Sequence, residues 1–166
     1  MSYKRGHVKP WWNEDFKKLN YIRYELTNDY DISRWREEGY NNETFGGMVY
    51  NMTQEMPVDS DRFLTLFDWK DCAISYYCML TNDILPQHRD QYPGYKKRNN
   101  LDDTSSIKKA VIFLEDWRSG HYFEIDGDAI VNWQAGDWVR WGGECPHMAA
   151  NIGIEPRYTL QITGHK

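Results

Sequence analysis

The 166-residue sequence is short of the features that would place it in several specialised classes of protein. Its three cysteines, Cys72, Cys78 and Cys145, are odd in number and provide neither a disulfide framework nor a paired Cys-x-x-Cys zinc motif. No apolar run approaches the length that spans a bilayer, and the N-terminus leads into no apolar signal region. We therefore expect a soluble protein of a reducing, cytoplasmic compartment that does not associate with membranes.

Positive charge is also scarce. Lys and Arg number 20 against 25 Asp and Glu, which gives a formal net charge of -5 at pH 7. General affinity for nucleic acid depends on a basic surface, so this composition argues against nucleic acid as a partner. Aromatic side chains are abundant instead, with 8 Trp, 12 Tyr and 6 Phe, a content consistent with a β-rich fold and a lined pocket.

The chain is expected to form one domain over residues 1–166, because no linker, repeat or low-complexity segment divides it. Residues 1–70 are expected to be a helical N-terminal support. Within them we predict a loose basic arm over residues 1–10, short helices over 31–38 and about 60–69, and a short strand over 48–52. Helices are expected only in this part of the chain, before residue 71.

After residue 71 the apolar pattern changes to a period of about two, which predicts some eight short strands of a sandwich or barrel over residues 71–166. The final strand, 157–163, alternates cleanly, so one face can line a polar cavity while the other packs on the N-terminal helices. Residues 91–106 are predicted to be a long polar loop. Both a lid over a binding site and a solvated loop fit its composition.

Candidate metal ligands occur near the start of this region and near its end. In an extended segment residues i and i+2 point to the same side, so His88 and Asp90 can bind one ion together, and His147 on a later strand would be the third ligand. Two imidazoles and one carboxylate that leave other positions open suit catalysis by non-haem Fe(II). The alternative is a surface His-x-Asp pair and an unrelated core histidine.

Arg157 lies ten residues beyond His147, and Thr159 shares its strand face. A buried guanidinium can donate two parallel hydrogen bonds to a carboxylate, although an arginine in a surface ion pair fits the sequence too.

In these residues the chain resembles the 2-oxoglutarate- and Fe(II)-dependent oxygenases. The family pattern is His-x-Asp, a distal His, and an Arg about ten residues further on that is followed two positions later by Ser or Thr. Here it reads His88-Arg89-Asp90, His147, Arg157 and Thr159, within residues 80–164. The resemblance implies a mainly β fold with N-terminal helices, a double-stranded β-helix of the jelly-roll, cupin-like kind. It also implies a dioxygenase that uses O2, Fe(II) and 2-oxoglutarate, hydroxylates a C–H bond and releases succinate and CO2.

The resemblance further assigns roles to side chains around the cosubstrate. Arg157 would bind the C5 carboxylate of 2-oxoglutarate, and Thr159 would add a hydroxyl hydrogen bond. Tyr77 or its neighbour Tyr76 could reach the same molecule; we prefer Tyr77, with core packing as the alternative. Lys109 is a weaker candidate for a carboxylate in the pocket.

Other readings of the site remain. His121 and Cys145 lie near the pattern, and we interpret them as a structural histidine and a packing cysteine. Related halogenases have a small residue where this chain has Asp90, so the carboxylate argues for hydroxylation. The alternative function is a cupin-like metal-binding or small-molecule sensing domain without oxygenase turnover. Cupins usually carry a denser histidine cluster, whereas His88 is the only histidine between residues 8 and 120. The substrate is expected to be a small molecule, a protein or a peptide.

Overall fold

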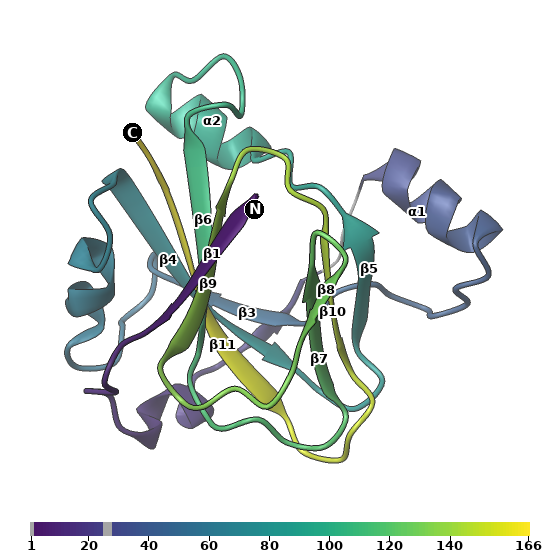
Figure 1. The fold of residues 1–166 in the computed structure, drawn as a ribbon, viewed down its shortest axis with the longest axis horizontal. Helices are drawn as coiled ribbons and strands as arrows, with labels where there is room; N and C mark the ends of the chain where they lie inside the picture. The colour runs from purple at the N-terminus through teal and green to yellow at the C-terminus, as the bar shows by residue number, and fades with distance from the viewer. Residues whose placement is uncertain (1, 25–27) are drawn as a thin grey trace.

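Two antiparallel β-sheets form most of the protein in the computed structural model, which describes residues 2–24 and 28–166 (Figure 1). The larger sheet has seven strands in the order β1-β9-β6-β11-β4-β3-β2, and the smaller has four in the order β5-β10-β7-β8. The strands are β1 (Tyr3–His7), β2 (Ile22–Arg23), β3 (Met48–Asn51), β4 (Lys70–Met79), β5 (Ile84–His88), β6 (Ile107–Phe113), β7 (His121–Ile125), β8 (Asp128–Ile130), β9 (Asp137–Gly142), β10 (His147–Asn151) and β11 (Arg157–His165). This architecture confirms the prediction of a mainly β protein.

Strand β11 lies in the middle of the larger sheet, between β4 and β6, and its two faces differ as predicted. Leu160 and Ile162 are fully buried on the outer face, where they pack with Phe16 and Phe63 from the N-terminal segment. The inner face, with Arg157 and Thr159, points toward the smaller sheet. A second apolar cluster joins the two sheets, with contributions from Met79, Phe113, Phe123, Ile125 and Val139.

The N-terminal segment forms strands of the larger sheet as well as helices. The predicted loose arm over residues 1–10 is wrong, because Tyr3–His7 forms β1 and pairs with β9 in the register Tyr3↔Trp141 to His7↔Asp137. Strands β2 and β3 extend the opposite side of the same sheet. The helical support predicted for residues 1–70 is therefore a mixture of strands and short helices. β1 covers backbone groups of β9 that would otherwise form an open edge.

Helices lie around the outside of the two sheets (Figure 1). They are the 3-10 helices η1 (Glu14–Lys18) and η2 (Ser60–Thr65), and the α-helices α1 (Asp29–Glu37) and α2 (Pro93–Asn99). Within the described residues, none of the helices has both the length and the apolar character needed to cross a membrane. The prediction that helices occur only before residue 71 is wrong because of α2.

Helix α2 lies inside the segment predicted to be a polar loop. Pro93 is at its first turn, where a missing N–H costs nothing. Tyr95 is buried beneath the helix, and its hydroxyl group lies 3.0 Å from His165 Nδ1 at the end of β11 and donates to the backbone oxygen of Asp71. These contacts attach the segment to the larger sheet. A role as a lid stays a prediction.

Candidate metal centre

Three potential metal ligands meet at one end of the smaller sheet. Strands β5 and β10 pair so that His88 and His147 are directly opposite each other, and Asp90 follows two residues after His88. The Nε2 atom of His88 lies 3.5 Å from Asp90 Oδ1, and that of His147 lies 3.3 Å from Asp90 Oδ2. One ligand atom from each of the three residues falls within 4.8 Å of the others. The three side chains can therefore surround a single ion.

Both imidazoles are oriented by their second ring nitrogen. His88 Nδ1 donates to the carbonyl oxygen of Pro86 and His147 Nδ1 to that of Cys145, each at 2.9 Å. A carbonyl oxygen can only accept, so Nδ1 carries the proton and neutral Nε2 keeps its lone pair for a metal. The two histidine residues are 6% and 5% exposed. This is the hydrogen bonding typical of metal-binding histidines.

Helix α1 supports the ligand strand from outside. Trp35 of this helix is fully buried, its indole Nε1 donates to the carbonyl oxygen of Gln87 at 3.0 Å, and its ring lies 6.2 Å from that of His88. Trp141 of β9 packs against the other histidine, with 4.8 Å between the ring centroids of Trp141 and His147. Rigid aromatic neighbours thus fix both imidazoles in position.

Lys109 on β6 completes the local charge pattern. Its ammonium lies 2.7 Å from Asp90 Oδ2. Burial alone would raise the pKa of the Asp90 carboxyl, but Lys109 and the two histidines outweigh burial and hold that pKa well below its usual range. Burial lowers the pKa of His147, which favours the neutral imidazole. Asp90 is therefore ionised and the histidine neutral, the states that bind a metal.

The three residues open into a cavity of about 270 Å³ between the two sheets. The residues that the sequence analysis preferred for the metal and the cosubstrate all line it, as does Lys109, whereas Tyr76 does not. The lining is Tyr24, Val49, Ser75, Tyr77, Leu85, His88, Asp90, Lys109, Val111, Phe123, Trp141, His147, Ala149, Arg157, Thr159 and Gln161. The roles of these residues remain predictions, but their convergence on one cavity is a feature of the fold.

Arg157 is the unusual member of this lining. It is 2% exposed, and no carboxylate of the described chain lies within ion-pair distance of it. Its Nη1 has a weak contact with Met79 Sδ at 3.6 Å, and its Nε has no hydrogen-bond partner within residues 2–24 and 28–166. The guanidinium is also 5.5–5.9 Å from the ring centroids of Phe113, Phe123 and Trp133. Burial lowers the pKa of Arg157 to about 10.

Two hydroxyl groups accompany the guanidinium. Tyr77 and Thr159 are cross-strand partners on β4 and β11 and are 5% and 1% exposed. The Tyr77 hydroxyl has no hydrogen-bond partner in the described part of the chain, and burial raises its pKa. Tyr76 points to the opposite face, where its hydroxyl lies 2.8 Å from Ser60 Oγ. Of the two tyrosines considered, the structure thus places Tyr77 at the cavity.

The other residues considered from the sequence lie outside the cavity. His121 Nε2 is 2.9 Å from the carbonyl oxygen of Glu155, and its ring stacks on Trp133. The Cys145 thiol points to Ser2, so this residue serves the site only through the carbonyl that accepts from His147. Sequence reasoning missed Ser75, although strand parity could have found it, because it lies two residues before Tyr77 on β4.

The fold is shared with solved structures whose sequences differ widely from this one. A prolyl-4-hydroxylase from Pseudomonas putida matches over 99% of this chain and 92% of its own, with 16% identity and a TM-score of 0.61. The fold is a double-stranded β-helix, as predicted. A cupin protein from Bacteroides fragilis matches over 68% of this chain and 83% of its own, with 18% identity and a TM-score of 0.42. No protein-family model and no curated protein sequence matches the chain.

Proposed function

We propose that the protein is a 2-oxoglutarate- and Fe(II)-dependent dioxygenase that hydroxylates a C–H bond of a small-molecule or peptide substrate. One observation carries the proposal: a buried arginine without a carboxylate partner in the described chain shares a cavity with a His-Asp-His cluster. A metal-binding domain has no use for such a cation. A cosubstrate with a metal-chelating end and a distal carboxylate would bind the metal at one end and the arginine at the other.

His88, Asp90 and His147 would hold the Fe(II) ion. Their ligand atoms are two neutral nitrogens and one carboxylate, a set that suits non-haem Fe(II) and leaves positions open. Fe(II) bound there would supply O2 activation coupled to the oxidative decarboxylation of 2-oxoglutarate to succinate and CO2. A cytoplasmic location belongs to the same proposal, since all three cysteines are free thiols and Fe(II) also needs reducing conditions.

Arg157 would bind the distal carboxylate of 2-oxoglutarate through two parallel N–H donors. The hydroxyl of Tyr77 can donate to the same carboxylate, because that group is buried, and no residue of the described chain accepts its proton. Thr159 lies across from Tyr77 and offers a second hydroxyl. Val111 and Phe123 add apolar walls to the cavity, and an apolar surrounding strengthens each charged hydrogen bond.

Succinate formation tests the proposal. The purified protein, supplied with Fe(II), O2 and 2-oxoglutarate, should release succinate slowly even before a substrate is known, and His147→Ala should abolish this turnover. His121→Ala is the matched control and should retain it, because His121 lies outside the cavity. Binding of 2-oxoglutarate without succinate would instead favour the cupin-like sensing domain. Absence of both would refute the proposal.

A further inference from the structure

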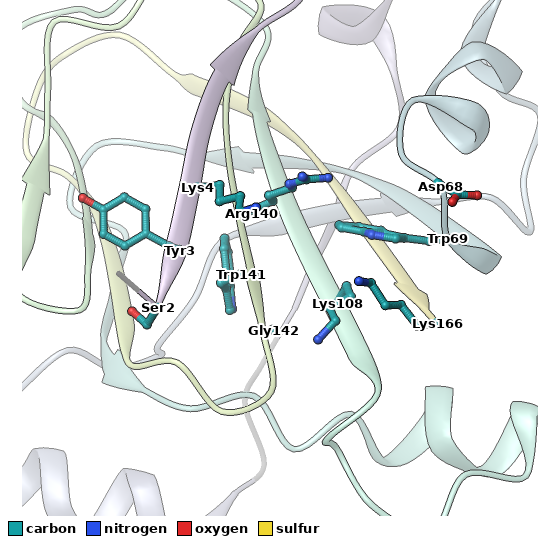
Figure 2. A pocket seen from close by; sticks show the side chains of 10 residues that line it. All are labelled: Ser2, Tyr3, Lys4, Asp68, Trp69, Lys108, Arg140, Trp141, Gly142 and Lys166. Atoms are coloured by element: carbon teal, nitrogen blue, oxygen red, sulfur yellow. The ribbon is translucent and has the colours of Figure 1, made fainter.

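A second hollow lies on the outer face of the larger sheet, and Figure 2 shows the side chains that line it. Its volume is about 360 Å³. Four basic side chains line it, from four separate segments: Lys4 of β1, Lys108 of β6, Arg140 of β9, and Lys166 just after β11. The indole of Trp69 forms part of the wall. We call these five residues the basic hollow.

The register of the sheet brings these cations together. Lys4 and Arg140 are directly opposite each other on β1 and β9, so they share one face. Lys108 on β6 is opposite Gly142. A Cβ at position 142 would lie 2.6 Å from Lys108 Nζ, so the lysine side chain lies across the bare glycine backbone. Glycine at this position thus leaves the space that the lysine occupies.

Close packing also fixes the position of the Trp69 indole. A Cβ at Gly164 would lie 2.8 Å from the Cβ of Trp69, and Phe67 stacks on the Trp69 indole with 4.6 Å between centroids. Phe67 also holds the Arg140 guanidinium, which lies 5.1 Å from its ring centroid. Packing thus holds Lys108, Arg140 and Trp69 in place, whereas Lys4 and Lys166 are exposed side chains.

The basic hollow has an excess of positive charge. Not one of its four cations forms an ion pair within the residues that the structure describes, although the whole chain has a net charge of -5. One acidic side chain, Asp68, borders the hollow, and Figure 2 shows it at the margin beyond Trp69. Like charges on neighbouring strands destabilise a sheet. An anionic ligand would relieve that repulsion.

We propose that the basic hollow binds the polyphosphate group of a small soluble ligand. Lysine and arginine are the side chains that bind phosphate oxygens, and four cations around one hollow match a group with several negative charges better than a single carboxylate. This inference does not rest on the proposed function, because no residue of the basic hollow lines the metal cavity.

Calorimetric titration with inorganic tripolyphosphate tests the inference. The wild type should bind it, and Lys108→Gln/Arg140→Gln should weaken binding about a hundredfold, because each lost charge-assisted hydrogen bond is worth about tenfold. Lys9→Ala/Lys18→Ala removes the same amount of charge from exposed positions outside the hollow and should bind as the wild type does. No heat at millimolar tripolyphosphate, or equal weakening in both double variants, would overturn the proposal.

Two further experiments exclude a contribution from the metal site and distinguish the possible sources of the ligand. Tripolyphosphate chelates divalent metals, so the titration is repeated with Asp90→Ala, a variant that should lack the metal. Retained affinity supports binding in the hollow. Lost affinity would mean that the heat came from chelation of the bound metal and would overturn the inference. ATP and vesicles containing a phosphatidylinositol phosphate distinguish the two sources of such a group. Displacement of tripolyphosphate by ATP supports a soluble ligand, whereas binding to the vesicles alone would overturn that part of the proposal.

Discussion

Replacing Arg157 with methionine should change stability and cosubstrate binding in opposite directions. The guanidinium is buried and has no carboxylate partner in the described chain, so it opposes folding unless a ligand neutralises it. Methionine has a similar length and no charge. We expect Arg157→Met to raise the free energy of unfolding of the ligand-free protein and to weaken 2-oxoglutarate binding about a hundredfold.

The size of the expected change in stability follows from the pKa of the guanidinium. Burial lowers that pKa from its ordinary value to about 10, a shift that corresponds to about 3 kcal/mol. Because the folded pKa is the lower one, the penalty is fully present below pH 10 and fades as the pH rises from there toward the ordinary pKa of arginine. Contacts with the three aromatic rings return roughly 0.5–2 kcal/mol. The net gain in Arg157→Met should be about 1–2.5 kcal/mol, or roughly 3–7 °C in melting temperature.

Thermal unfolding with and without 2-oxoglutarate measures both effects. With Mn(II) in the site, 2-oxoglutarate at about a hundred times its dissociation constant should stabilise the wild type by about 2.7 kcal/mol. The same concentration should leave Arg157→Met almost unchanged. Arg118→Met is the control, because Arg118 is exposed and its surface pair with Glu155 contributes less than about 1 kcal/mol.

Two results would refute this reasoning. A melting temperature of Arg157→Met well below that of the wild type would show that the guanidinium has a stabilising partner inside the protein. Unchanged 2-oxoglutarate affinity would place the distal carboxylate elsewhere, with Lys109 as the next cation in the cavity to test.

The remaining predictions concern neighbouring side chains. Alanine at His88, Asp90 or His147 should each abolish tight metal binding in elemental analysis, and full metal content in His147→Ala would contradict the proposed ligand set. Tyr77→Phe should weaken 2-oxoglutarate binding roughly tenfold by calorimetry without lowering the melting temperature, because the hydroxyl has no protein partner in the described chain. Lys109→Met should tighten Mn(II) binding roughly tenfold, since the ammonium both repels the metal and competes for Asp90; equal or weaker affinity would show that Lys109 supports the ligand instead.

The placement of the site could be predicted from sequence because it depends on local periodicity. Alternation along 157–163 separates Arg157 and Thr159 from Leu160 and Ile162, whatever the rest of the fold does. The prediction that His88, Asp90 and His147 converge needed only the family spacing and two strands that pair. The structure places all three at one point of the β5–β10 ladder.

The errors involve contacts that are distant in sequence. β1 reads Tyr-Lys-Arg-Gly-His, with one large apolar residue, and it is a strand because β9, more than a hundred residues later, offers an edge to pair with. Helix α2 has a visible signal in Pro93, but seven residues are too few to be stable alone. Its contact between Tyr95 and His165 has no trace in local pattern. The ion pair of Lys109 with Asp90 is equally invisible from sequence.

A metal-binding domain and a 2-oxoglutarate-dependent enzyme require different side chains on the inner face of β11. A domain that only holds a metal gains nothing from a buried cation at position 157, and an apolar side chain there would stabilise the fold. An enzyme that binds 2-oxoglutarate needs the guanidinium and tolerates its cost, since ligand binding supplies the missing carboxylate. Tyr77 adds a second polar group without a partner in the described chain, directly across from Thr159. Two such groups side by side are hard to explain as packing, whereas one bound carboxylate satisfies both.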